Sequence, residues 1–441
     1  MKSSHFRILT SIAFLTATPA FAQMDPQAII ARHVAEGAHV SRGSMGTIIT
    51  PASSVRGPVD DGSRMYTNTK ILVPDVPMGP HNANAPNTNA PPFSGYYYAN
   101  TPSSLACVYG LVAVAQGCHP DLFHTNATGG SRAVGIVDAY NGMNVRADLQ
   151  HYATQFGLPA ITATNLVIYY CTGTTAATCA TGNAPTAYDS GWEGEISLDV
   201  QMVHAMAPSA KIFLVLAKDN QNASLLAASD KAAALVAAAN GGEVSMSFGH
   251  HEISGDSASD PHYVKAKVVF FASTGDDIIP GYPAASPNVV AVGGTTVSRT
   301  PANGKFFGEA SWTEAGAGPS AFIARPSYQP ASVGAKRALP DVAAVANPDT
   351  GVWVYISAQG GWFVFGGTSA ASPVMAAIVN NAGSFKGSTA AQQTLMYSAL
   401  GKAADWYDVK QGTCGAQQGY WAKAGLDFCG GIGAPRGLAG K

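Results

Sequence analysis

Ser369 lies in the sequence GGTSAASP, followed by the small, apolar run VMAAIVNNA. A serine hydroxyl is a weak nucleophile until a neighbouring group takes its proton, so its chemistry depends on the base beside it. The run predicts a helix with Pro373 in its first turn. Ser369 would then lie at a helix N-terminus, where backbone N–H groups favour the negative charge of an oxyanion. A simple helix cap is the alternative.

Two carboxylates are candidates for the base, because no His follows the serine pattern in the order that other serine hydrolases need. Glu195 and Asp199 are four residues apart in SGWEGEISLDVQMVHAM, a predicted helix that ends before Pro208. Both therefore project from one face. On a solvated face the pair would be mildly destabilising, whereas buried together the two would share a proton and one pKa would rise.

A third carboxylate, Asp276, lies in ASTGDD directly after an apolar strand. The C-terminal ends of such strands are where α/β proteins assemble their sites. A turn-forming Asp after Gly275 is the alternative for this position taken alone.

Apolar runs alternate with helical patterns along most of the chain. Strands are predicted at 133–137, 211–217, 243–248, 267–273 and 288–294, and helices at 145–156 and 225–239. Continuous apolar strands between helices are typical of a buried parallel sheet. The expected fold class is therefore α/β.

Composition excludes some functions and indicates export. Of the 441 residues 12% are charged, the net charge is -2, and no Lys/Arg run is present, so a nucleic-acid surface is not expected. Residues 1–22 carry Lys2 and Arg7, an apolar run and Ala20-Phe21-Ala22, the pattern of a signal peptide. No later run reaches the roughly 18 apolar residues of a membrane span. A secreted or periplasmic monomer is expected.

The six cysteines fall into three close pairs, Cys107 with Cys118, Cys171 with Cys179, and Cys414 with Cys429. Six thiols formally allow about 15 connectivities, but local pairing is expected in an oxidising compartment. Zinc is the weaker interpretation, because the chain has no CxxC pair.

Taken jointly, these motifs resemble the sedolisins, the serine-carboxyl peptidases. The resemblance runs from about Gly95 to Lys441 and includes TPSSLACVYG, VGIVDAYN, the Glu/Asp helix, the TGD loop and GGTSAASP, in the family's order. It implies a subtilisin-like three-layer fold with a mostly parallel central sheet flanked by helices. It also implies that Ser369 is the nucleophile, Glu195 the general base and acid, Asp199 its hydrogen-bonded partner and Asp276 the oxyanion-hole side chain.

These roles predict an acid-active endopeptidase with protein or peptide substrates. A carboxylate base still works at a pH where an imidazole is protonated. Asp276 can stabilise an oxyanion only while its carboxyl is protonated. An inactive homologue that binds peptides is the first alternative. An esterase-type hydrolase is disfavoured because the GxSxG motif is absent.

The resemblance also implies one structural calcium ion near the C-terminus. Its loops YDVKQG and AKAGLDFCGGIGAP would supply the carboxylates of Asp408 and Asp427 and the carbonyl oxygens of Val409, Lys423 and Gly425. Oxygen-only ligands suit a hard cation. Leu426 departs from the family, which usually has Trp there.

Two further departures concern the base and the N-terminal region. Where some relatives extend the Glu/Asp pair with a Glu and a Trp, this chain offers Asp138 and Phe248, and Asp138 is left outside the predicted catalytic set. Residues 23–94 form a short leader or propeptide with a Pro/Asn-rich linker at 77–92. If this region is an inhibitory leader, cleavage is expected near residues 90–96; the alternative is a remnant of a lost prosegment domain. In either case 95–441 is expected to be the catalytic domain.

Overall fold

The structure is a computed structural model that describes residues 25–57, 61–75, 90–93, 95–182, 184, 187–415 and 419–441. The predicted signal peptide, and most of the predicted linker, lie outside the described residues.

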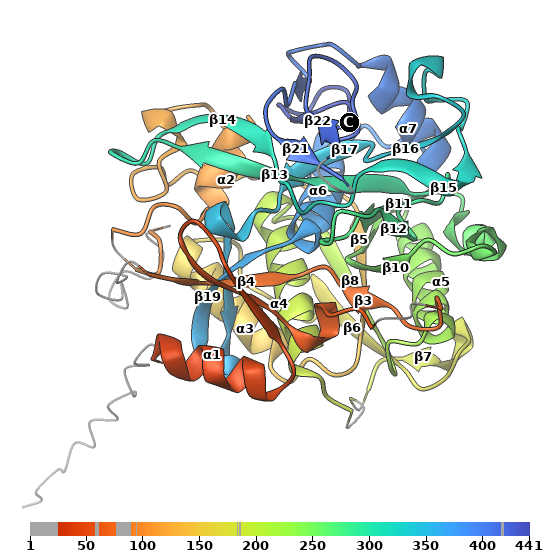
Figure 1. Cartoon of the computed structure of the whole chain (residues 1–441). Helices are drawn as coiled ribbons and strands as arrows, with labels where there is room; N and C mark the ends of the chain where they lie inside the picture. Colours follow the sequence, from red (N-terminus) through yellow and green to blue (C-terminus); the bar gives the residue numbers. More distant parts are fainter. Residues whose placement is uncertain are drawn as a thin grey trace, which may run out of the picture.

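A nine-stranded, mostly parallel sheet forms the centre of the molecule (Figure 1). Its path is β14 (Phe306–Ser311), β13 (Val290–Arg299), β11 (Val268–Ser273), β9 (Gly242–Met246), β5 (Ala133–Ala139), β8 (Lys211–Ala217), β6 (Leu166–Cys171) and β7 (Cys179–Ala180), with β17 (Val342–Val345) also paired to β13. Only β14 and β7 pair antiparallel. The apolar runs of the inner strands fit this position, since a strand covered on both faces needs no polar side.

Helices cover both faces of this sheet and make three layers. Alternate residues of β5 point to opposite sides, so Val134 and Ile136 pack in one core cluster and Val137 and Ala139 in another. The first cluster includes α3 (Val145–Phe156), α4 (Ser190–Met206) and α6 (Thr368–Ala382), and the second includes α5 (Asn222–Ala238). Two further helices are α2 (Pro102–Val108) and α7 (Thr389–Ser398).

The elements expected from the sequence are present, with two corrections. The predicted strand at 243–248 is broken at Ser247, between β9 and β10 (Phe248–His251). Pro373 lies inside α6, six positions into the helix, and not in its first turn. The break at Ser247 and the proline in α6 both lie close to Ser369. There the Ser247 backbone and side chain form hydrogen bonds with Ser369.

A second, antiparallel sheet joins the N-terminal region to the strand before Ser369. Its order is β1 (His39–Arg42), β2 (Gly46–Thr50), β4 (Lys70–Pro74), β19 (Gly361–Gly366) and β18 (Val352–Ile356). Buried residues of β2 and β4 belong to the same core cluster as α4 and α6. Strands β2 and β4 are therefore packed against the remainder of the chain, although the sequence shows little periodicity there. Their removal near residues 90–96 stays a prediction.

Smaller elements complete the fold. A three-stranded sheet has the order β12 (Gly281–Tyr282), β10 and β3 (Tyr66–Thr67). The two-stranded pairs are β15 (Gly318–Ala324) with β16 (Lys336–Leu339), β20 (Trp406–Tyr407) with β23 (Ala434–Pro435), and β21 (Thr413–Cys414) with β22 (Tyr420–Trp421). Helix α1 (Pro26–Ala35) precedes β1.

The three predicted disulfides are confirmed, between Cys107 and Cys118, Cys171 and Cys179, and Cys414 and Cys429. Within the described ranges, no helix combines the length and the apolar character that crossing a bilayer requires.

Candidate active site

Ser369 lies in the first turn of α6 and is fully buried. Gly367 caps this helix with a φ of +98°, a conformation that L side chains rarely adopt. The Ser369 hydroxyl donates a 2.9 Å hydrogen bond to the carbonyl oxygen of Ser247 and accepts one of 3.1 Å from the backbone N–H of Asn68. The predicted position at a helix N-terminus is confirmed.

The break between β9 and β10 and the proline inside α6 have one shared explanation. Pro373 has no N–H, so it leaves the carbonyl oxygen of Ser369 without its helical partner. The Ser247 hydroxyl lies 3.3 Å from that oxygen and 2.9 Å from Asp199 Oδ1. One hydroxyl proton cannot serve both acceptors. If Asp199 is protonated, its carboxyl group can donate to the Ser247 hydroxyl oxygen. The Ser247 hydroxyl proton is then available for the carbonyl oxygen of Ser369.

Glu195 and Asp199 both lie on α4, and both are fully buried. Burial raises the pKa of Glu195 well above its usual value, and the charge of Asp199 raises it further. The Thr69 hydroxyl, which donates to Glu195, and the nearby Ser369 side chain act in the opposite direction on that pKa. The Asp199 pKa is likewise raised, first by burial and then by the charge of Asp138. Of the two possibilities for this carboxylate pair, a solvated helix face or a buried pair with a raised pKa, the fold adopts the buried pair.

Asp138 joins this pair as a third carboxyl group. It lies in β5 and is fully buried, and no described residue makes a hydrogen bond to either of its oxygens. Burial raises its pKa well above the usual value, and the charge of Glu195 adds to the effect. Three buried carboxyl groups this close cannot all be ionised, so protons are shared among them.

Asp276 follows β11 and approaches the site from the other side of Ser369. Its Oδ1 accepts hydrogen bonds from the Thr368 N–H at 2.7 Å and the Thr368 hydroxyl at 2.8 Å. Burial raises the pKa of Asp276 to about 7, against the opposing charge of Lys70 and these hydrogen bonds. Among the described residues, Asp276 Oδ2 is buried without a hydrogen-bond partner.

The carbonyl oxygen of Asn68 lies near both the Ser369 N–H and Asp276 Oδ2. The Ser369 N–H donates to it at 3.0 Å. A Cβ added to Gly367 would lie 2.0 Å from that oxygen and 2.4 Å from Asp276 Oδ2, so the two oxygens are neighbours. The Ser369 N–H together with a protonated Asp276 beside this oxygen would make an oxyanion hole.

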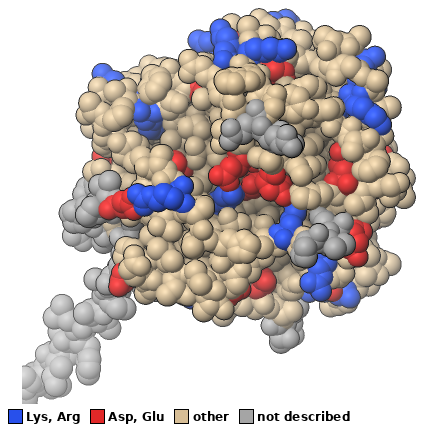
Figure 2. All heavy atoms as spheres, viewed as in Figure 1, with Lys and Arg blue, Asp and Glu red and all other residues tan. Residues whose placement is uncertain are grey.

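Three residues at this centre, Asn68, Thr69 and Lys70, were missed by reasoning from the sequence. The Thr69 hydroxyl donates to Glu195 Oε2, and Lys70 forms an ion pair with Glu314. No local pattern marks these residues, because their only link to Ser369 is across about 300 residues of chain. In the view of Figure 2, acidic side chains gather in a hollow near the middle of the molecule, with basic side chains beside them.

The predicted calcium loops form a separate region near the C-terminus. Asp427 accepts hydrogen bonds from the N–H groups of Lys423, Cys429 and Gly430 at 2.7, 2.7 and 2.8 Å. Burial raises the Asp427 pKa, and the charge of Asp408 raises it further, so the two carboxylates are neighbours. The described residues contain no group of three or more His, Cys, Asp or Glu side chains that could hold a metal.

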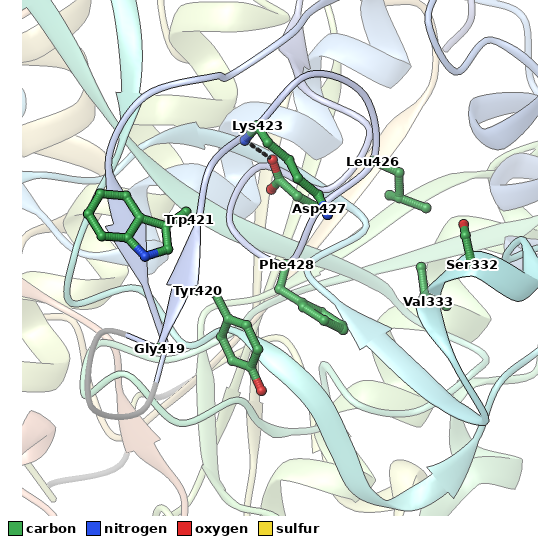
Figure 3. Close-up of a pocket in the computed structure, with 9 residues that line it drawn as sticks. All are labelled: Ser332, Val333, Gly419, Tyr420, Trp421, Lys423, Leu426, Asp427 and Phe428. Carbon is green, nitrogen blue, oxygen red and sulfur yellow. Dashed lines mark hydrogen bonds between the residues drawn. The ribbon is translucent and has the colours of Figure 1, made fainter.

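A calcium site here would thus depend on main-chain oxygens. No described residue donates a hydrogen bond to the carbonyl oxygens of Val409, Lys423 or Gly425. Two neighbouring carboxylates and three free carbonyls fit a hard cation. A hollow of about 350 Å³ adjoins this loop, where Leu426 lies on the side of Ser332 and Val333 (Figure 3).

Comparisons with known proteins agree with this geometry. No protein-family model matches the chain. Kumamolisin from Bacillus sp. (strain MN-32) is 28% identical over 383 residues, which cover 78% of this chain and 65% of kumamolisin. Sedolisin from Pseudomonas sp. (strain 101) is 28% identical over 367 residues, covering 71% of this chain and 59% of sedolisin. A solved structure of Pseudomonas sedolisin, a serine-carboxyl proteinase complexed with two molecules of pseudo-iodotyrostatin, superimposes with a TM-score of 0.61 at 25% identity, over 77% of this chain and 96% of that one.

The chain is similar to the sedolisins over most of its length. Its fold is the subtilisin-like α/β fold expected from the sequence, with helices on both faces of a mostly parallel sheet. The chain spans 65% and 59% of the length of the two curated relatives. In this chain, Ser369, Glu195, Asp199 and Asp276 come together in one buried centre with Asp138. The Asp408 and Asp427 loops lie apart from it.

Proposed function

We propose that the protein is an exported, acid-active serine-carboxyl endopeptidase. The observation that supports this most is the convergence of Ser369, Glu195 and Asp276 on a single peptide unit, that of Asn68 and Thr69. A nucleophile, a titratable base and an oxyanion hole within reach of one peptide bond are what acyl transfer requires.

In this proposal the Ser369 Oγ attacks the substrate carbonyl carbon while Glu195 removes the Ser369 hydroxyl proton. The hydroxyl now donates to Ser247 and must turn towards Glu195 for this step. Glu195 then gives the proton to the leaving amine, and water releases the acyl group by the reverse sequence. Burial and then the charge of Asp199 keep the Glu195 pKa high, and the charge of Asp138 acts in the same way on Asp199.

The negative charge on the substrate oxygen is held by the Ser369 N–H and by a protonated Asp276. An ionised Asp276 would repel that charge, so activity requires a pH below the Asp276 pKa of about 7. Acid activity therefore follows from the burial of one carboxyl group.

Hydrolysis of a denatured protein between pH 3 and pH 8 tests the proposal, with Ser369→Ala as the matched control. Cleavage in acid only, abolished by the substitution, is the expected result. Faster cleavage at pH 8 than at pH 4 would contradict the role of Asp276. Cleavage that persists in Ser369→Ala would contradict the nucleophile. No observation favours an inactive, peptide-binding homologue, since none of the four side chains is missing.

We further propose one structural calcium ion, bound by Asp408, Asp427 and the carbonyl oxygens of Val409, Lys423 and Gly425. The free carbonyl oxygens and the paired carboxylates support it. Bound there, calcium would tie the loops on either side of the Cys414–Cys429 disulfide together. Export by an N-terminal signal peptide, supported by three disulfides, is part of the same proposal. Monomeric action on protein or peptide substrates also belongs to it.

A further inference from the structure

We propose that Trp312 and Glu314 form a subsite that selects a Lys or Arg side chain two residues after the cleaved bond of a substrate. This inference rests on the proposed peptidase function and deepens it, because it names a sequence preference of the same site. The segment Tyr66–Lys70, which lies along Ser369, marks the path that a substrate would follow in its place.

The place of Lys70 relative to the catalytic groups follows from the peptide unit beside Ser369. The carbonyl oxygen of Asn68 accepts from the Ser369 N–H at 3.0 Å and neighbours Asp276 Oδ2, so it lies where the oxygen of an attacked carbonyl would lie. Lys70 is two residues further on, and its backbone pairs with Gly366 in β19. In an extended peptide held this way, the second residue after the cleaved bond therefore has the position of Lys70.

Neighbouring side chains of this segment point in opposite directions. The Thr69 hydroxyl donates to Glu195 on α4. The Lys70 side chain instead contacts the turn between β14 and β15, which carries Trp312 and Glu314. This alternation is that of an extended strand. The turn is therefore reached by the second residue after the cleaved bond and not by the first.

The chemistry of this subsite suits a long cationic side chain. Lys70 Nζ forms an ion pair with Glu314 Oε2 and lies 5.8 Å from the centroid of the Trp312 ring. Lys70 is only 8% exposed, so these contacts replace most of its contact with water. A carboxylate and an indole face both attract a cation, either the ammonium of Lys or the guanidinium of Arg. A neutral or acidic side chain would make neither contact.

The turn that carries this subsite is fixed to the loop of Asp276. The Ile278 N–H donates to the carbonyl oxygen of Glu314 at 2.9 Å, and the Gly316 N–H donates to that of Gly275 at 2.8 Å. Burial is the main cause of the raised Asp276 pKa, and the charge of Glu314 also raises it, so Glu314 lies near the oxyanion hole. The subsite is thus held at a set distance from the reacting carbonyl, as the reading of one substrate position requires.

Both contact residues belong to the expected catalytic domain and keep their places without Lys70. Trp312 is almost fully buried in a small apolar cluster with Ala315 and Ala346, which fixes its ring. The Glu314 side chain is 40% exposed, so water can solvate its charge when no cation is bound. The subsite can therefore stand empty and accept a cationic side chain from another chain.

The test reads the cut positions in a mixture of denatured proteins of known sequence. Wild type, Glu314→Gln and Glu314→Lys digest the mixture at pH 5.5, and mass spectrometry identifies the residues on both sides of every cut. At this pH an exposed glutamate is mostly ionised and Asp276, with a pKa of about 7, is mostly protonated. Glu252→Gln is the matched control, because Glu252 is a partly exposed carboxylate that bonds the Ala321 N–H and not a cation.

We expect Lys and Arg to be enriched about 3- to 10-fold at the second position after the cut by the wild type and by Glu252→Gln. The enrichment should fall to about one in Glu314→Gln. Glu314→Lys should favour Asp and Glu at that position, a reversal that general damage to the fold would not produce. Matched peptides with Lys, Gln or Glu at this position should give the same order of kcat/KM.

The outcomes separate this inference from the proposed function. Hydrolysis by the wild type without enrichment of Lys and Arg at the second position overturns the subsite and leaves the peptidase function standing. An enrichment that persists in Glu314→Gln also overturns it, because another residue would then be responsible. If the wild type hydrolyses none of the proteins, the proposed function fails and the inference fails with it.

Discussion

The backbone N–H of Ser369 donates a 3.0 Å hydrogen bond to the carbonyl oxygen of Asn68, a residue about 300 positions earlier in the chain. This bond places a peptide unit of the N-terminal region in the oxyanion hole. It links the chemistry of the site to the pairing of β4 with β19, since any movement of that strand pair moves the carbonyl.

Gly367→Ala should remove activity and destabilise the fold. The added methyl group would lie 2.0 Å from the Asn68 oxygen, at a backbone φ of +98°. Gly383→Ala is the matched control, because that φ is also positive, at +67°, and nothing lies within 4 Å of its Cβ position. We expect the control to cost about 1 kcal/mol of unfolding free energy and to keep its activity. Equal activity of the two variants would contradict the close approach at Gly367.

The pH profile of peptide hydrolysis should fall as pH rises through about 7, because Asp276 loses the proton that it must donate. Asp276→Asn keeps a donor at every pH, so its residual activity should lack this alkaline limb. Asp276→Ala removes the donor and should lower kcat by roughly 100- to 1,000-fold. Profiles of kcat/KM for the three proteins provide the check. If the kcat/KM of Asp276→Asn still falls at alkaline pH, a group other than Asp276 causes that fall.

Asp138→Asn should shift the acid limb of the kcat/KM profile to lower pH. The charge of Asp138 raises the pKa of Asp199, and Asp199 in turn raises that of Glu195. Removing this charge makes the base easier to ionise in acid. Asp148→Asn is a control, since Asp148 binds the Ser357 N–H and has no contact with the carboxyl cluster. An unchanged limb in Asp138→Asn would show that Asp138 has only a packing role.

Stability should decrease as pH rises from about 4.5 towards 8. Burial raises the Glu243 pKa from 4.5 to about 8, so the folded state holds a proton that the unfolded state loses. Stability from such a group is fully present below the unfolded pKa and is lost as pH rises through the folded one. The slope approaches about 1.4 kcal/mol per pH unit for each such group. Glu243→Gln keeps an acceptor for Asn380 and should flatten the dependence of Tm on pH.

Exhaustive chelation should lower Tm and release one calcium ion per chain. The reason is that Asp408 and Asp427 would be left as unscreened neighbouring carboxylates. Asp408→Asn should lower Tm and abolish the response to chelation, because it removes a charged ligand and keeps the side-chain shape. Asp405→Asn, three residues earlier, is the control and should still respond. Metal analysis that finds no calcium in the wild type would contradict the site.

Several features of this protein follow from short stretches of sequence. The four-residue spacing of Glu195 and Asp199 places both on one face of a helix whatever surrounds it. The small residues around Ser369 specify the start of α6, and three cysteine pairs close loops short enough to identify. The apolar runs predict buried strands between helices. Each of these depends on contacts within about 20 residues, which local spacing records.

Only the tertiary structure decided that Glu195 and Asp199 are buried, that Asp138 joins them, and that Asn68 and Thr69 lie against Ser369. Burial of a helix face depends on what packs over it, so a solvated carboxylate pair and a proton-sharing pair have the same spacing. Likewise, β4 and β19 are far apart in the chain, and their register arises from interstrand hydrogen bonds and side-chain packing that neither strand's own pattern contains. Local spacing by itself thus determined the chemical groups of this protein, and long-range packing decided their protonation and what occupies their site.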